Sequence, residues 1–174
     1  KVLLNCYDYL RTFDKVIINH DEEPSLVEEG VMNESHRSAM LGMKGRPTVA
    51  EDIAVARDIM LAEYADAKVH VAHISSARAG DIVRQAKARG VKVTAEATPQ
   101  HMTMTDDCVE LFDSSTKINP PLREQKDVDA VLEGLKDGTI DCIVTDHSPH
   151  AQEEKDREYI YAPSGFPGLE TAVG

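Results

Sequence analysis

Residues 68–73 read Lys-Val-His-Val-Ala-His, and this short run of apolar residues, ending in an imidazole, decides the fold. Three similar runs occur along the chain: residues 15–20 (Lys-Val-Ile-Ile-Asn-His), 91–96 (Val-Lys-Val-Thr-Ala-Glu) and 141–146 (Asp-Cys-Ile-Val-Thr-Asp). Such runs are typical of strands buried on both faces of a parallel sheet. We therefore predict four parallel strands, adjacent in the sheet and in sequence order.

Helical segments separate these runs. Thr48 and Glu51 have the spacing of a capping box, and the apolar face predicted behind it consists of Val49, Ile53, Ala56, Met60 and Tyr64. The next two helices are expected to end at Gly90 and Gly138, and residues 3–10 suggest a further helix. Alternating strands and helices predict an α/β fold with right-handed crossovers. Four strands form either an open sheet or half of a (β/α)8 barrel, since a complete barrel needs about 250 residues.

Composition narrows the class of protein. The 174 residues, 41% hydrophobic and 29% charged, fit one soluble globular domain. A net charge of −12 argues against a nucleic-acid partner, and no apolar run is long enough to span a membrane. The three cysteines, Cys6, Cys108 and Cys142, form neither a disulfide framework nor a metal pair, so we expect buried free thiols and a cytoplasmic setting.

Polar side chains stand at the carboxyl ends of the predicted strands. His20 ends the first, His73 the second and Asp146 the fourth. Two imidazoles and a carboxylate from separate strands match the ligand set of a hydrolytic zinc site, and barrel active sites lie at this face. One histidine at a strand end is usually only a hydrogen-bonded polar residue, but three such residues at one edge favour a site. His70 alternates with His73 and is expected to point elsewhere.

Two loops add candidate residues. Residues 117–123 (Lys-Ile-Asn-Pro-Pro-Leu-Arg) form an extended segment that can hold the Asn119 amide in place, although an ordinary loop is the simpler interpretation of that segment alone. We expect Asn119 to lie away from the strand ends that hold metal. Residues 146–150 (Asp-His-Ser-Pro-His) place a carboxylate and two imidazoles close together. We expect the segment from His147 to Pro163 to be mobile.

These motifs together resemble the dihydroorotases of the cyclic amidohydrolase group. The matching segments, in family order, are residues 20–23, 70–76, 96–101, 117–123, 145–150 with Lys155, and 168–171. The resemblance implies that residues 1–174 are part of a single amidohydrolase barrel domain. They would form an incomplete half-barrel of about four parallel βα units, strands 5 to 8, without the N-terminal half and the C-terminal part of the family's length.

The resemblance also implies the site. His20, His73 and Asp146 would bind one or two zinc ions, and Asp146 would be the catalytic acid and base. Asn119, His150, Ser164 and Gly165 would line the substrate pocket. The implied reaction is the reversible hydrolysis of dihydroorotate to N-carbamoyl-aspartate in pyrimidine biosynthesis. Because the ligands expected from the missing strands are absent, we expect this 174-residue chain alone not to be a competent enzyme.

Two other interpretations stay open. Another cyclic amidohydrolase, an allantoinase or a hydantoinase, would share the two histidines and the aspartate. An inactive dihydroorotase-like subunit that scaffolds aspartate transcarbamoylase would typically have lost zinc ligands. The expected partners are a small-molecule substrate, a second copy in a homodimer and, in some relatives, aspartate transcarbamoylase.

Overall fold

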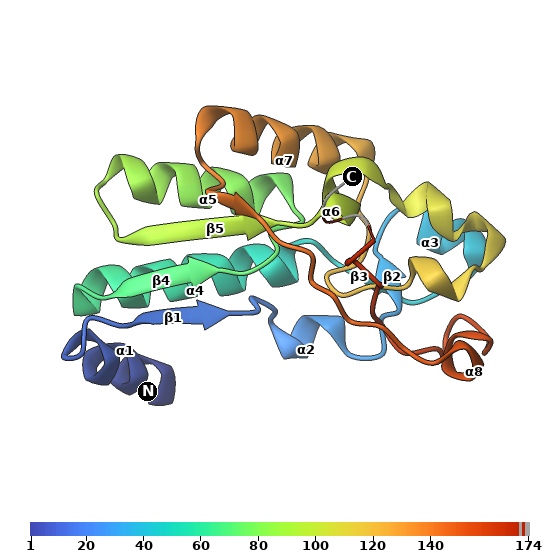
Figure 1. Ribbon diagram of the computed structural model, residues 1–174, viewed down its shortest axis with the longest axis horizontal. Coiled ribbons are helices and arrows are strands. Elements are labelled where there is room, and N and C mark those ends of the chain that lie inside the picture. Colours follow the sequence, from blue (N-terminus) through green and yellow to red (C-terminus); the bar gives the residue numbers. More distant parts are fainter. Residues whose placement is uncertain (171, 173–174) are drawn as a thin grey trace.

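A parallel sheet forms the centre of the chain. The computed structural model describes residues 1–170 and 172, and within them the main sheet has the strand order β1-β4-β5-β6 (Figure 1). Its strands are β1 (Val16–Asn19), β4 (Lys68–Val71), β5 (Val93–Ala97) and β6 (Cys142–Ile143). Every neighbouring pair is parallel, with Ile17 opposite Val69 and Glu96 opposite Cys142. The predicted α/β fold, with these runs adjacent and in sequence order, is confirmed.

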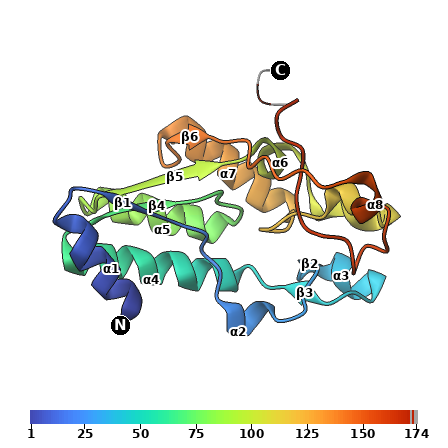
Figure 2. The same cartoon turned by 60° about the horizontal axis from the view of Figure 1, so that its bottom comes forward.

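Helices cover one face of this sheet. They are α1 (Val2–Arg11), α4 (Val49–Ala65), α5 (Ala77–Ala88) and α7 (Gln125–Asp137), and neighbours in this series pack on one another (Figure 2). The core between helices and strands contains Tyr7, Ile59, Val69, Val83 and Val131, all fully buried. Gly90 and Gly138 follow α5 and α7 with φ of 82° and 81°, left-handed conformations that cost glycine little, so the predicted helix ends are confirmed.

The other face of the sheet is open. Ile18 is 66% exposed and Ile143 is 56% exposed, although both lie on strands. A hollow of about 480 Å³ runs along this face, lined by Val16, Ile18, Val93 and their neighbours. The exposed apolar surface is what an incomplete barrel predicts for its unpartnered interior.

Helix α4 departs from the sequence-based prediction in two ways. Thr48 makes no side-chain cap, because its backbone is helical (φ −56°, ψ −32°) and not in the extended conformation of an N-cap. Glu51 does not complete the capping box either, since its carboxylate binds the loop after β4. The predicted apolar face is wrong as well, since Met60 and Tyr64 are 65% and 80% exposed. The buried residues of the helix are mostly small: Ala50, Ala54, Val55, Ile59, Ala62 and Ala65. Small side chains let α4 approach both the sheet and its two neighbouring helices.

A second region, not foreseen from the sequence, lies beyond the carboxyl ends of the strands (Figures 1 and 2). Its parallel pair is β2 (Met32–Asn33) with β3 (Gly45–Arg46). Short helices surround this pair: α2 (Pro24–Val27), α3 (His36–Leu41), α6 (Pro99–Thr103), η1 (Asp106–Leu111), η2 (Ser114–Thr116) and α8 (Gln152–Lys155). Met32, Val109 and Tyr159 form its small core.

The cysteines differ from the sequence-based prediction in their exposure. All three cysteines are free, but Cys6 and Cys142 are exposed and Cys108 is half-buried, so the predicted burial is wrong. Among the described residues, no helix has the length and apolar character needed to cross a membrane.

Candidate metal and substrate site

Two imidazoles meet at the carboxyl edge of the sheet. His20 directly follows β1, and His73 follows β4 two residues after its last strand residue. His20 Nδ1 lies 3.0 Å from His73 Nε2, and the ring centroids are 4.7 Å apart. The parallel pairing of β1 with β4 brings these side chains together across 53 positions of sequence. The prediction that the two histidines lie together is confirmed.

The imidazoles are suited to binding a cation. Partial desolvation of the ring, and then the neighbouring His73, lower the pKa of His20 and favour its neutral form, which offers a lone pair. The buried Nδ1 of His73 has no hydrogen-bond partner within the described residues. Zinc–nitrogen bonds of 2.0–2.1 Å at a tetrahedral angle would place two ligand nitrogens about 3.3 Å apart, close to the arrangement of this pair. The two imidazoles therefore fit two ligand positions of a zinc ion with little movement.

His73 is held in place by the end of strand β5. Its φ of 32° lies in the left-handed region, which is uncommon for residues other than glycine. Glu96 Oε1 accepts a hydrogen bond from the His73 backbone nitrogen at 3.3 Å, and Glu96 Oε2 lies 2.8 Å from His70 Nε2. His70 therefore points away from His20, as predicted. With Cys142, His70 and Glu96 form a second group of potential ligand atoms within 4.8 Å of one another on the open sheet face.

Asn119 contacts one of the candidate ligands directly. Its Nδ2 is 3.2 Å from His20 Nε2, and its Oδ1 accepts a hydrogen bond of 2.8 Å from Arg46. The expectation that Asn119 lies away from the metal-holding strand ends is therefore wrong. The Pro-Pro segment reaches the carboxyl end of β1, so the Asn119 amide adjoins the His20 imidazole.

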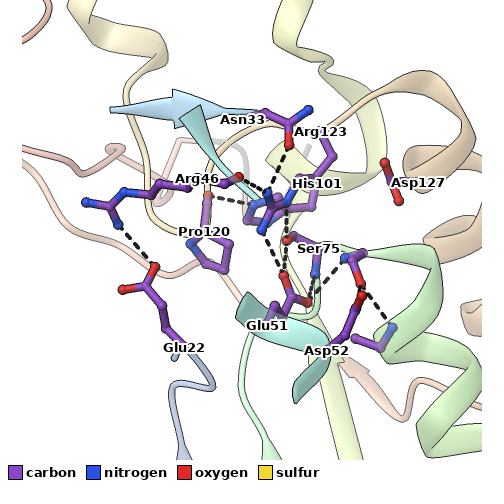
Figure 3. A network of polar contacts seen from close by, with 12 residues as sticks. Glu22, Asn33, Arg46, Glu51, Asp52, Ser75, His101, Pro120, Arg123 and Asp127 are labelled. Atoms are coloured by element: carbon purple, nitrogen blue, oxygen red, sulfur yellow. Dashed lines mark hydrogen bonds and ion pairs between the residues drawn. The ribbon is translucent and has the colours of Figure 1, made fainter. Parts of the chain in front are cut away.

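Arg46 is a site residue that the sequence analysis missed. It ends the short strand β3, and its guanidinium also contacts Glu22 at 3.1 Å (Figure 3). The same group donates to the Gly30 carbonyl at 2.6 Å. No motif marks it, because its place at the site depends on the unforeseen β2–β3 region. It brings a positive charge beside Asn119.

Asp146 reaches the same edge but stays apart from the two imidazoles. It follows β6 in a left-handed conformation, with φ of 45°. Its side chain is exposed and, among the described residues, forms no hydrogen bond with either histidine. Its negative charge is nevertheless close enough to favour the protonated form of His20. A shift of the Asp146 segment toward the imidazoles would complete the predicted ligand set.

The other substrate-pocket candidates form one group. His150 Nε2 lies 3.0 Å from the Ser164 carbonyl oxygen. The Gly165 N–H donates to the Lys117 carbonyl at 2.9 Å, so this backbone donor is already occupied. Gly165 has a φ of 154°, and a Cβ there would collide with the Ser148 carbonyl and the His150 ring. Glycine is therefore required where these segments meet.

A buried charge network underlies the site (Figure 3). Arg123 and Glu51, each 4% exposed, form an ion pair of 3.3 Å. Glu51 Oε1 accepts hydrogen bonds from the backbone nitrogens of Ser75 and Ser76 at 2.8 and 3.2 Å. Arg123 donates to Ser75 Oγ at 3.0 Å and to the Arg46 carbonyl at 3.0 Å. The network thus joins the loops that carry His73, Asn119 and Arg46.

The chain is similar to known proteins over most of its length. The family model described as Dihydro-orotase-like matches residues 7–79, which include both His20 and His73. The chain is 56% identical over 166 residues to the dihydroorotase of Pelotomaculum thermopropionicum, covering 95% of this chain and 39% of that protein. It is 48% identical over 173 residues to the dihydroorotase of Endomicrobium trichonymphae, covering 99% and 41%.

Along almost its whole length the chain is similar to dihydroorotases, and residues 7–79 match the Dihydro-orotase-like family model. It spans about two-fifths of the length of these relatives. Solved structures share its fold: L-hydantoinase from Arthrobacter aurescens superposes with a TM-score of 0.86 at 24% identity, covering 98% of this chain and 39% of that one. Dihydropyrimidinase from Brevibacillus agri superposes with a TM-score of 0.79 at 26% identity, covering 97% and 39%.

The segments that resemble dihydroorotases contain the residues that meet at the sheet edge. Residues 20–23, 70–76 and 117–123 hold His20, His73 and Asn119, and residues 145–150 hold Asp146. The last matching segment, residues 168–171, ends at Thr171, which lies outside the described residues. This family match therefore rests on motifs that are far apart in sequence and close together in space.

Proposed function

We propose that this chain is the second half of the catalytic barrel of a dihydroorotase, strands 5 to 8, within a single amidohydrolase domain. The observation that carries the proposal is the pair of imidazoles 3.0 Å apart at the ends of two adjacent parallel strands, with Asn119 beside them. The open apolar sheet face supports it, because a second half-barrel would cover Ile18 and Ile143.

His20 and His73, with Asp146, would hold zinc in the intact enzyme. When bound, zinc would lower the pKa of a water molecule to about 7 and polarise the carbonyl of the cyclic amide. The chain's own contribution is to favour the neutral form of His20, whose pKa is lowered, and to hold the two imidazoles close together. Partial desolvation of the His20 ring lowers its pKa, and the contact from Glu96 to the His73 backbone holds the second ring in place.

Asp146 would act as the acid and base of the reaction. Its carboxylate is exposed and forms no hydrogen bond with the imidazoles among the described residues, so it is free to accept a proton from the attacking water. The same carboxyl would then donate that proton to the leaving ring nitrogen. In ring closure, the steps run in the opposite direction.

Dihydroorotate would be bound by Asn119, His150 and the Ser164–Gly165 backbone. Arg46 would add a positive charge near the carboxylate of the substrate. Arg46 already holds the Asn119 carbonyl, so the Asn119 amide is oriented toward His20. The identity of 56% to a dihydroorotase, against 26% to a dihydropyrimidinase, favours dihydroorotate over hydantoins as the substrate. A homodimer and, in some settings, association with aspartate transcarbamoylase remain part of the proposal.

The test uses the full-length protein that carries this chain. Zinc-loaded protein is assayed for ring opening of dihydroorotate, allantoin and hydantoin, and we expect turnover of dihydroorotate to dominate. Asp146→Asn should lower kcat by at least about 100-fold, the usual lower size of a general acid–base contribution. Asp129→Asn, on the exposed surface of α7, is the matched control and should leave kcat unchanged.

Three results would contradict the proposal. Preference for allantoin or hydantoin would assign the chain to a related amidohydrolase. Absence of turnover, together with co-purification of aspartate transcarbamoylase without zinc, would indicate the scaffold subunit. Turnover by the 174-residue chain alone at the rate of the full-length protein would show that the other half of the barrel is dispensable.

A further inference from the structure

Two lysines connect the loops on either side of the candidate pocket. Lys117 is only 6% exposed, and its Nζ donates to the carbonyls of Tyr159 and Ile160 at 2.8 and 3.0 Å. Lys155 reaches in the opposite direction, and its Nζ donates to the carbonyls of Ser114, Lys117 and Pro163 at 3.0, 3.4 and 3.0 Å. Each ammonium group therefore binds the backbone of the segment that carries the other lysine.

Backbone carbonyls, not carboxylates, make the close contacts of these ammonium groups. Among the described residues neither lysine forms a salt bridge, and burial lowers the pKa of both, although the Asp113 carboxylate partly offsets this effect at Lys155. An ammonium group has three donors, and Lys155 directs all three toward carbonyl oxygens. Lys117 also lies 5.6 Å from the centre of the Tyr159 ring. Burial of a charge that forms no salt bridge is unfavourable. These contacts therefore indicate that the lysines are needed to hold the connected loops in position.

The connected segments carry the pocket residues. Asn119 is two residues after Lys117, while His150, Ser164 and Gly165 lie on the segment that Lys155 joins. The Lys117 carbonyl accepts hydrogen bonds from both the Gly165 N–H and the Lys155 ammonium group. Both lysines thus tie the segment from His147 to Pro163, which the sequence analysis expects to be mobile, to the segment that carries Asn119.

We propose that Lys117 and Lys155 form a latch that sets the distance between Asn119 and the His150–Gly165 segment and thereby tunes substrate affinity. They are positioning residues that touch neither the substrate nor the metal ligands. The inference rests on the proposed function for its kinetic consequence, but its structural consequence can be measured without any turnover. Loss of the latch should loosen residues 147–165 and leave the His20–His73 pair intact.

The experiment compares Lys155→Met and Lys155→Arg with the unchanged full-length protein. Methionine keeps the length of the side chain but removes its charge and donors, whereas arginine keeps charge and donors in a planar arrangement. We expect KM for dihydroorotate to rise about tenfold in Lys155→Met, the size of one lost hydrogen bond to a charged group. Lys155→Arg should show a smaller rise, and kcat and bound zinc should stay within about twofold of the unchanged protein.

Hydrogen exchange provides the independent readout. Amides of residues 147–165 should exchange about tenfold faster in Lys155→Met, while amides of β4 and β5 keep their protection. Lys126→Met removes an exposed lysine paired with Glu124 and serves as the matched control, with no change expected. Unchanged exchange at residues 147–165 in both Lys155 variants would overturn the latch, as would faster exchange spread evenly over the sheet. If Lys155→Met does not fold, Lys155→Arg alone tests the latch. Faster exchange at residues 147–165 with a raised KM would support it, and unchanged values of both would overturn it. Absence of turnover in the unchanged protein would contradict the proposed function, not the latch.

Discussion

Protonation of His101 should destabilise the fold. This imidazole is 3% exposed in helix α6, with Nε2 2.9 Å from the Pro120 carbonyl and Nδ1 2.8 Å from Thr98 Oγ1. The carbonyl can only accept, so Nε2 carries the proton and Nδ1 accepts from the threonine hydroxyl in the neutral ring. Burial lowers the pKa of His101 to about 4. An unfolded histidine has a pKa of about 6.5.

The difference between the two pKa values sets the size of the effect. Because the unfolded chain binds the proton more readily, the stabilisation is fully present above about pH 6.5 and is lost as the pH falls to about 4. A difference of about 2.5 units at 1.36 kcal/mol per unit corresponds to about 3 kcal/mol. Loss of the His101 contact would release Pro120, which directly follows Asn119 in the site.

Urea unfolding of the protein and of His101→Gln at several pH values measures this linkage. Carboxylates titrate in both proteins, so the difference between the two free energies of unfolding isolates His101. That difference should shrink by about 3 kcal/mol between about pH 7.5 and pH 4. His36→Gln changes an exposed histidine and should give a difference that does not vary with pH. A constant difference for His101→Gln as well would refute the reasoning.

Three further substitutions test the site and its support. Glu96→Ala removes the acceptor for the His73 backbone and should weaken zinc binding about 10-fold to 100-fold, measured by calorimetry, with unchanged affinity counting against this role. Arg123→Met leaves the buried Glu51 charge unpaired and should lower the free energy of unfolding by about 3–5 kcal/mol in urea titrations, whereas a loss below about 1 kcal/mol would show that the pair is solvated. Asn119→Ala should raise KM for dihydroorotate. Because Asn119 contacts His20, a modest loss of zinc is now expected too, and unchanged zinc content would show that this contact does not support the ligand.

The strands were predictable because their signal is local. Each run has β-branched apolar residues within a short stretch, such as Val69 and Val71 in residues 68–73, and a strand identified in this way also fixes where its carboxyl end lies. That placement was sufficient to bring His20 and His73 together, because parallel strands end at one edge. The face of α4 was not predictable in the same way. The helix has apolar side chains nearly all round, and only the packed structure selects the side with Ala54 and Ala62 over the side with Met60 and Tyr64.

The rest of the site depends on contacts between distant segments. Arg46 meets Asn119 across 73 residues, and Asn119 meets His20 across 99. Neither contact has a periodicity or a spacing that a single sequence reveals. Lys117 and Lys155 both lie in recognisable motifs, but their side chains bind backbone carbonyls, which every residue offers, so sequence alone cannot identify the partner.

For Glu51, the sequence pattern predicts the correct type of hydrogen bond but the wrong partner residues. Its spacing from Thr48 predicts a carboxylate that accepts backbone N–H groups at the start of a helix, and it does accept such groups. They belong to Ser75 and Ser76, at the start of α5, and not to the helix that carries Glu51. Ion pairing with Arg123 explains the change, because the same carboxylate can then bind a loop, a helix start and a buried guanidinium. The loop that follows His73 is thereby tied to the segment that follows Asn119, so the position of the candidate ligand depends on a charge pair outside the site.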